Sequence, residues 1–120
     1  VHAGHPGLEH GVIEAAVGAV RELGRGPVRA FLGPCIRPAR YEFGADDLAR
    51  LVERLGPQVE SRTRDGRPAF DVPTAVRLVL EQSGVDAFED ANVCTADSAG
   101  HFSYRRDGVT GRQATIAVLA

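Results

Sequence analysis

Residues 101–112 read HFSYRRDGVTGR, a stretch that combines two aromatic residues, three arginines and two glycines. Phe102 and Tyr104 alternate with polar residues, which predicts a strand with one buried face. Gly108 follows an aspartate, a typical turn sequence because glycine readily adopts positive φ. Residues 113–119 are rich in β-branched side chains and predict a returning strand. The stretch therefore predicts a strand–turn–strand corner near the end of the chain.

Three arginines would gather at this corner: Arg105, Arg106 and Arg112. A guanidinium group donates hydrogen bonds in a planar fork that matches a phosphate or a carboxylate. The alternative is that these arginines are solvated surface charges paired with Asp97 and Asp107. The sequence leaves both interpretations open, and the three arginines are candidate anion-holding, catalytic residues.

Working outward from the corner, the apolar spacing predicts three helices. Residues 8–23 and 45–55 each carry an apolar stripe at helical spacing. Asp71 is expected to cap the third helix, which ends at Gly84. Extended segments are expected at residues 1–3, 27–32, 41–43, 85–94 and in a hairpin over 59–70 with its turn at 64–66. This order predicts an α+β fold in which three helices pack on a mixed β-sheet.

Length and composition are those of one globular domain over residues 1–120. The net charge of −2 gives no electrostatic reason to expect nucleic acid or a membrane surface as a partner. Two cysteines are too few for a disulfide framework, so we expect a cytoplasmic location. Because the chain contains no methionine, Val1 is not a retained initiator, and we expect the domain to lack an upstream portion.

Single residues carry the remaining chemical signals. His2 lies beside small residues at an expected strand end, where a histidine suits metal ligation or acid/base chemistry. Cys35 follows a Gly-Pro pair at the exit of an expected strand, and Cys94 also lies at a strand end. Each thiol is either a nucleophile or ligand, or an inert buried group. The sequence contains no HxH, HExxH or CxxC spacing, so it offers no self-contained metal site.

Several stretches taken together resemble the downstream portion of the polyphenol oxidase family, also called the laccase-domain or YfiH-like family. These stretches are VHAGHPGLEHGVIEAAV, LGPCIRPARYEFG, FDVPTAVRLVL and CTADSAGHFSYRRDGVTGRQATIAVL. The order and spacing match along essentially the whole chain, and FSYRRDG-x-TGRQ is the most specific part. The usual HAGWRG form is altered here, since His5 and Pro6 stand where Trp and Arg are common.

This resemblance implies a zinc-dependent enzyme of purine nucleosides, with phosphorolysis and adenosine deamination as its activities. The HAG histidine of the family is a zinc ligand, which corresponds to His2, while the other ligands are expected upstream of this chain. The expected partners are a purine nucleoside and phosphate. Cys35, Tyr41 and Phe102 are the expected substrate contacts.

Two rival hypotheses remain. A domain lacking its upstream portion would be catalytically silent, or would complete its site only with those residues or with a partner chain. The family's older name suggests a copper polyphenol oxidoreductase, but copper is less expected here because multicopper centres need many histidines. The chain has four, with no HxH pair.

Overall fold

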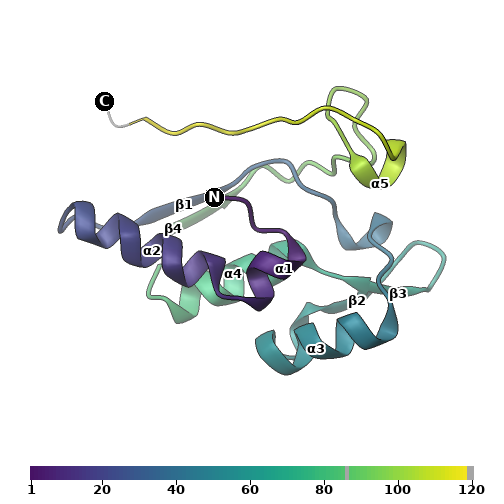
Figure 1. The fold of residues 1–120 in the computed structure, drawn as a ribbon, viewed down its shortest axis with the longest axis horizontal. Helices are drawn as coiled ribbons and strands as arrows, with labels where there is room; N and C mark the ends of the chain where they lie inside the picture. The colour runs from purple at the N-terminus through teal and green to yellow at the C-terminus, as the bar shows by residue number, and fades with distance from the viewer. Residues whose placement is uncertain (86, 119–120) are drawn as a thin grey trace.

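The computed structural model describes residues 1–85 and 87–118, and Figure 1 shows their arrangement. The helices are α1 (His5–Glu9), α2 (Val12–Leu23), α3 (Ala45–Leu55), α4 (Val72–Gln82) and α5 (Tyr104–Asp107), with short 3-10 turns η1 (Pro38–Arg40) and η2 (Pro57–Val59). The strands are β1 (Arg29–Leu32), β2 (Glu60–Arg62), β3 (Pro68–Phe70) and β4 (Ala87–Asp90). The predicted α+β class is confirmed.

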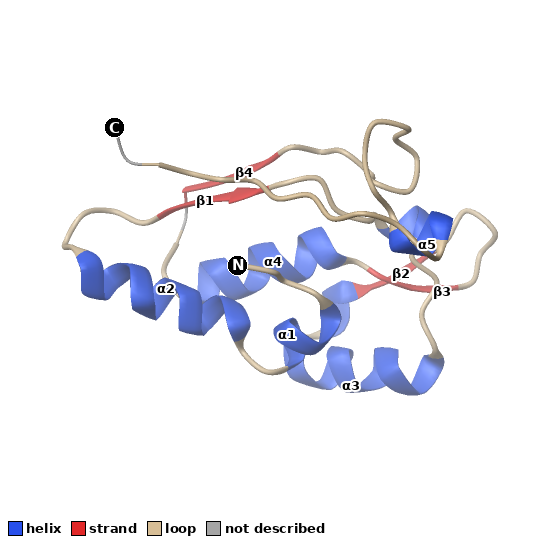
Figure 2. Ribbon diagram, turned by 45° about the horizontal axis from the view of Figure 1, so that its top comes forward, coloured by secondary structure: helices blue, strands red, loops and turns tan. Residues whose placement is uncertain are grey.

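The strands of the described residues form two small sheets, one parallel and one antiparallel. β1 pairs with β4 in parallel, with Arg29 opposite Ala87 and Leu32 opposite Asp90. β2 pairs with β3 in the predicted hairpin. Figure 2 shows helices α1, α2 and α4 on one side of the β1–β4 pair, and Figure 1 shows the C-terminal segment on the other side. The strands of the expected mixed β-sheet are therefore divided, among the described residues, between one parallel and one antiparallel pair.

One apolar core joins helices α1 to α4 to both sheets. Apolar burial is the main stabilising contribution to such a domain. Its largest fully buried side chains are Leu8, Leu51, Val59, Phe70, Val79 and Val85. Phe70 of the hairpin packs against a small aromatic group. The centre of its ring lies 5.6 Å from the ring centre of Phe43 and 6.3 Å from that of Tyr41. Residues 41–43 make a single bridge to β3, with Glu42 opposite Ala69.

The helix and hairpin predictions for the middle of the chain are confirmed. α3 has the predicted bounds and buries Leu48, Leu51 and Leu55 on one face. The side chain of Asp71 accepts a hydrogen bond from the Thr74 N–H at 3.0 Å, as expected of a helix N-cap. Local signals were sufficient here because apolar spacing, cap and turn residues all indicate the same elements.

Near the N-terminus the prediction was wrong in two respects. Residues 1–3 form no strand, and the single helix expected over residues 8–23 is divided into α1 and α2. The break falls at Gly11, whose φ of 80° is incompatible with a continuous right-handed helix. The Gly-Pro loop expected before residue 8 is instead the first turn of α1, where Pro6 is tolerated.

The prediction of a strand–turn–strand corner near the end of the chain was also wrong. Residues 104–107 form the short helix α5, because the Ser103 side chain accepts a hydrogen bond from the Arg106 N–H. Residues 113–118 run extended without ladder pairing among the described residues, and Leu119 of the expected strand lies outside them. The extended segment expected at 85–94 contains β4, with Asp86 also outside the described residues.

Across the described ranges, no helix combines the length and apolar character needed to span a bilayer.

Candidate anion-binding site

Arg106 is fully engaged within its own chain. Its Nη1 donates to the carbonyl oxygens of Thr95 and Ser98, at 3.0 and 2.8 Å. Its Nη2 donates to the carbonyl oxygen of His101 at 2.9 Å. Nε and Nη2 also donate to the Asp107 carboxylate, which holds the pKa of that carboxyl below its usual value. A guanidinium has five N–H donors, so Arg106 has none left for a ligand.

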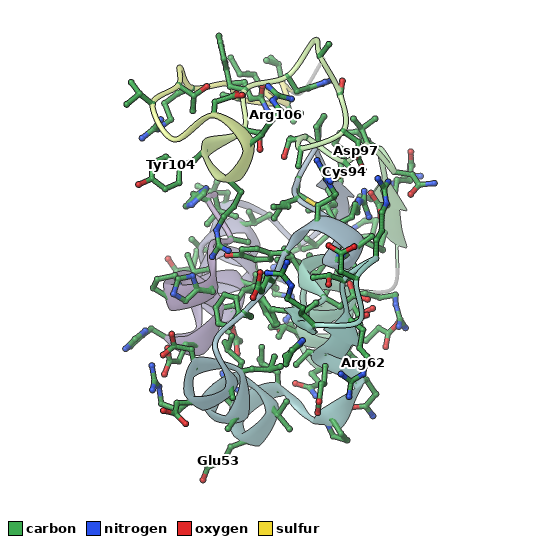
Figure 3. The ribbon with its side chains drawn as sticks, turned by 90° about the vertical axis from the view of Figure 1, so that its right-hand side faces the viewer. Glu53, Arg62, Cys94, Asp97, Tyr104 and Arg106 are labelled. Atoms are coloured by element: carbon green, nitrogen blue, oxygen red, sulfur yellow. The ribbon has the colours of Figure 1, made fainter. Side chains whose placement is uncertain are left out.

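These contacts make Arg106 a clasp for the loop of residues 95–101. Figure 3 shows Arg106 close to this loop, at the end of the molecule opposite Glu53. The loop also contains a hydrogen bond of 2.7 Å between Ser98 Oγ and His101 Nδ1. The geometry favours a structural role for Arg106, and its predicted role in holding an anion stays a prediction.

Arg105 points to a different place from Arg106. Its Nη1 donates to the carbonyl oxygen of Glu42 at 2.8 Å, and its guanidinium carbon lies 4.6 Å from the centre of the Tyr41 ring. Stacking over an aromatic face is a favourable position for a guanidinium. Burial raises the pKa of Tyr41, and the charge of Arg105 partly offsets this. Two of the predicted site residues, Arg105 and Tyr41, therefore meet although distant in sequence.

Arg105 and Arg106 border an open hollow of about 220 Å³ between α5, η1 and the β2–β3 turn. Three further arginines line it, namely Arg40, Arg64 and Arg67. Arg40 and Arg64 both pair with Asp97, and Arg67 pairs with Glu42. Among the described residues, Arg105 has no carboxylate within ion-pair distance. The hollow is thus an arginine-rich surface in which Arg105 keeps donors free for an anion.

The sequence interpretation missed the arginines of this hollow that lie outside the final stretch. Arg64 and Arg67 flank the turn of the β2–β3 hairpin, and Arg40 ends η1. The visible signal was the RTRDGR sequence, which places three arginines around one turn. Their meeting with Arg105 depends on tertiary packing, which no local pattern specifies.

Arg112 and Phe102 lie apart from the hollow. Arg112 Nη1 donates to the carbonyl oxygens of Thr110 and Gly111, its immediate neighbours. The Phe102 side chain is half-exposed, while its backbone N–H donates to the Gln113 side chain at 2.8 Å. Both remain predicted contacts, and neither is brought to Tyr41 by this chain.

His2 lies exposed beside Gly4 at the start of the chain. A Cβ on Gly4 would lie 2.8 Å from His2 Nε2, so glycine permits the close approach of this ring. The described residues contain no group of three or more His, Cys, Asp or Glu side chains placed to hold a metal. Tetrahedral zinc sites with an open position need three protein ligands. His2 alone therefore does not make a zinc site, nor do the described residues around it.

His5, which replaces the more common tryptophan, has a packing role. Its ring meets the Phe43 ring edge-on, with 5.1 Å between the ring centres. This contact fixes α1 against the aromatic group that contains Tyr41.

Cys35 is half-buried and packs against the core. Burial raises the pKa of its thiol to about 11, although the neighbouring Arg37 charge lowers it. A protonated thiol is a poor nucleophile. Toward a substrate, the described structure thus favours contact by Cys35 over attack by its thiol.

Over residues 1–120, the chain matches the family model described as multi-copper polyphenol oxidoreductase laccase. The chain belongs to this laccase-domain family, which confirms the resemblance drawn from its sequence. Curated relatives of the chain are named as purine nucleoside phosphorylases. A purine nucleoside phosphorylase of Streptomyces coelicolor is 44% identical over 115 residues, which are 94% of this chain and 47% of the relative. One of Corynebacterium glutamicum is 34% identical over 121 residues, 99% of this chain and 49% of the relative.

A solved structure supports the fold. The crystal structure of a Neisseria meningitidis protein superposes with a TM-score of 0.75 at 28% sequence identity. The match covers 90% of this chain and 46% of that protein. The chain thus spans about half the length of the curated relatives and of the solved structure that it matches.

Proposed function

We propose that this chain is the downstream part of a purine nucleoside phosphorylase. The observation that carries the proposal is the 44% identity to the Streptomyces coelicolor enzyme along 94% of this chain. In phosphorolysis, a phosphate oxygen bonds to the sugar C1′ while the bond from C1′ to the purine nitrogen breaks. The substrates are accordingly a purine nucleoside and inorganic phosphate, and the proposed location is the cytoplasm.

The arginine-rich hollow supplies a place for the phosphate. Arg105 would donate its free N–H groups to phosphate oxygens. Its stacking on Tyr41 would fix the orientation of the guanidinium group. Arg106 would act through the loop of residues 95–101, because its donors are already used. Holding phosphate in a fixed orientation lowers the entropic part of the reaction barrier.

We further propose that His2 is one ligand of a zinc ion whose other ligands come from outside these residues. A neutral imidazole is a common zinc ligand, and His2 is exposed. Metal analysis of the full-length protein should give stoichiometric zinc that falls strongly in His2→Ala. The 120-residue chain alone should bind zinc weakly. Stoichiometric zinc on the isolated chain, lost in His2→Ala, would show that its residues hold a complete site.

The activity test uses the full-length protein with inosine. Chromatography should detect release of the free base when phosphate is present and little release without it. Adenosine deamination is a second proposed activity and is followed by ammonia release from adenosine. The isolated chain should be silent in both assays, since it spans under half of the relatives. Equal base release with and without phosphate would contradict a phosphorylase.

A further inference from the structure

Cys35 and Cys94 lie opposite one another where the parallel pairing of β1 and β4 is resumed beyond both strands. The Cys35 N–H donates to the Val93 carbonyl at 3.2 Å, and the Thr95 N–H donates to the Cys35 carbonyl at 3.1 Å. Paired strands lie roughly 4.8 Å apart, and a disulfide joins Cα atoms about 4.4–6.8 Å apart. The bridge therefore places the Cα atoms of the two cysteines within the range that a disulfide spans.

The side chains of this pair also have a suitable environment. Residues directly opposite in a bridge project from the same face of the ladder. Both thiols are free and half-buried, so a small oxidant can reach the pair. Cys94 is close enough to act electrostatically on the Cys35 thiol. Cys35 packs against the apolar core, which leaves Cys94 as the more approachable of the two sulfurs.

We propose that Cys35 and Cys94 are a modification site, forming a reversible disulfide when the protein meets hydrogen peroxide. This inference goes beyond the proposed function and does not depend on it. Disulfides that form in a reducing compartment are usually transient and respond to the redox state.

The reaction divides into two balanced steps. The Cys94 sulfur gives up its proton and attacks one peroxide oxygen; the O–O bond breaks, the leaving hydroxide takes up that proton to become water, and Cys94 becomes a sulfenic acid. The Cys35 sulfur then attacks the Cys94 sulfur, the S–O bond breaks, and water leaves with the proton of Cys35. Two thiols and one peroxide thus give one disulfide and two waters. A cellular dithiol reverses the change by thiol–disulfide exchange.

The bond would tie together the two loops that leave β1 and β4. The first loop leads to Arg37, whose Nη1 donates to Asp90 Oδ2 at 2.7 Å. The second leads to Thr95, whose carbonyl oxygen accepts a hydrogen bond from Arg106 Nη1. Figure 3 shows Cys94 on the same side of the molecule as Asp97 and Arg106. Oxidation is therefore expected to restrain the loop that Arg106 clasps.

The test treats the full-length protein with equimolar hydrogen peroxide and then blocks free thiols by alkylation. Trypsin releases Cys35 within residues 30–40 and Cys94 within residues 78–105. Mass spectrometry should find these two peptides cross-linked, and dithiothreitol should separate them. Recovery of both peptides alkylated, or of Cys94 joined to any other thiol, would overturn the proposal.

Two controls connect the cross-link to the fold. In urea the folded pairing is lost, so the cross-link should form at least about tenfold more slowly; an equal rate would overturn the argument from bridge geometry. In Cys35→Ser the sulfenic acid on Cys94 should persist and be captured by dimedone. Far-UV circular dichroism verifies that this variant is folded, and a folded variant without the adduct would contradict the proposed first step.

Discussion

Arg105 stacks on the ring of Tyr41 and donates to the backbone of Glu42, which joins α5 to the segment before α3. This relationship links the most specific part of the sequence to the aromatic group of the core. Among the described residues, no carboxylate lies within ion-pair distance of Arg105, so its remaining donors are not used in an ion pair. We therefore assign the anion-binding role first to Arg105.

Replacement of Arg105 tests this assignment. A hydrogen bond to a charged group contributes roughly 1.5–3 kcal/mol, or about ten- to a hundredfold in affinity. Arg105→Ala in the full-length protein should raise the phosphate KM or lower kcat/KM by this factor, and Arg105→Lys should recover part of it. Arg29→Ala is the control, because Arg29 is exposed and only weakly paired with Glu89. Unchanged phosphate kinetics in Arg105→Ala would contradict the assignment.

Arg106 should behave differently from its neighbour. Arg106→Ala removes hydrogen bonds to three backbone carbonyls, so it should lower the thermal midpoint more than Arg112→Ala, which loses only contacts to adjacent residues. Lysine has three donors and no planar fork, so Arg106→Lys should restore only part of the midpoint. Differential scanning fluorimetry measures all three variants. A midpoint unchanged in Arg106→Ala would exclude the clasp.

The predictable part of the fold lies where several local signals agree. Residues 45–55 combine apolar spacing with a glycine on each side, and the helix has the bounds that this pattern predicts. The hairpin at residues 60–70 follows from its Asp-Gly turn. Asp71 similarly marks the start of α4 by its capping side chain.

Replacement of the α4 cap provides a stability test. Asp71→Ala removes the hydrogen bond to the Thr74 N–H and should reduce the free energy of unfolding by about 1 kcal/mol. Asp71→Asn is the matched variant, because an asparagine oxygen can accept the same bond. Urea denaturation measures both. Equal losses in the two variants would assign the effect to the charge of Asp71 and not to its capping bond.

The C-terminal stretch could not be predicted because its signals conflict. Phe102 and Tyr104 alternate as in a strand, yet Ser103 is also a good helix cap, and the cap prevails in α5. Residues 113–118 have a strand composition but find no ladder partner among the described residues. A pattern in one segment does not specify whether a second strand is available to pair with it.

The candidate site, like the fold, could be predicted from the sequence only in part. The final arginines and Tyr41 were identifiable as unusual residues, but the distinct directions of Arg105 and Arg106 were not. Neighbouring residues on a single helical turn project about 100° apart, and that turn was expected to be a strand. The involvement of Arg40 and Arg64 depends on packing of η1 against the hairpin turn.

Acid titration should reveal the Arg37–Asp90 pair. Hydrogen bonds from Arg37 hold the pKa of Asp90 below its usual value, despite some opposing desolvation. A carboxyl whose pKa is lower when folded stabilises the protein above its unfolded pKa of about 3.9, and this contribution is lost as the pH falls through the folded pKa. The thermal midpoint of the wild-type protein should therefore decrease once the pH is lowered below about 4. In Asp90→Asn it should be lower at neutral pH and fall less steeply; an equally steep fall would contradict this pair's role.

The most direct test of the central claim is to follow the fate of phosphate in the full-length protein. Phosphorus NMR of a reaction with inosine and inorganic phosphate should show ribose 1-phosphate forming in step with free base. The signal should fall strongly in Arg105→Ala. Free base formed without the sugar phosphate would indicate hydrolysis. Oxygen consumption with a phenol and added copper, without any sugar phosphate, would contradict the phosphorylase assignment in favour of a polyphenol oxidoreductase.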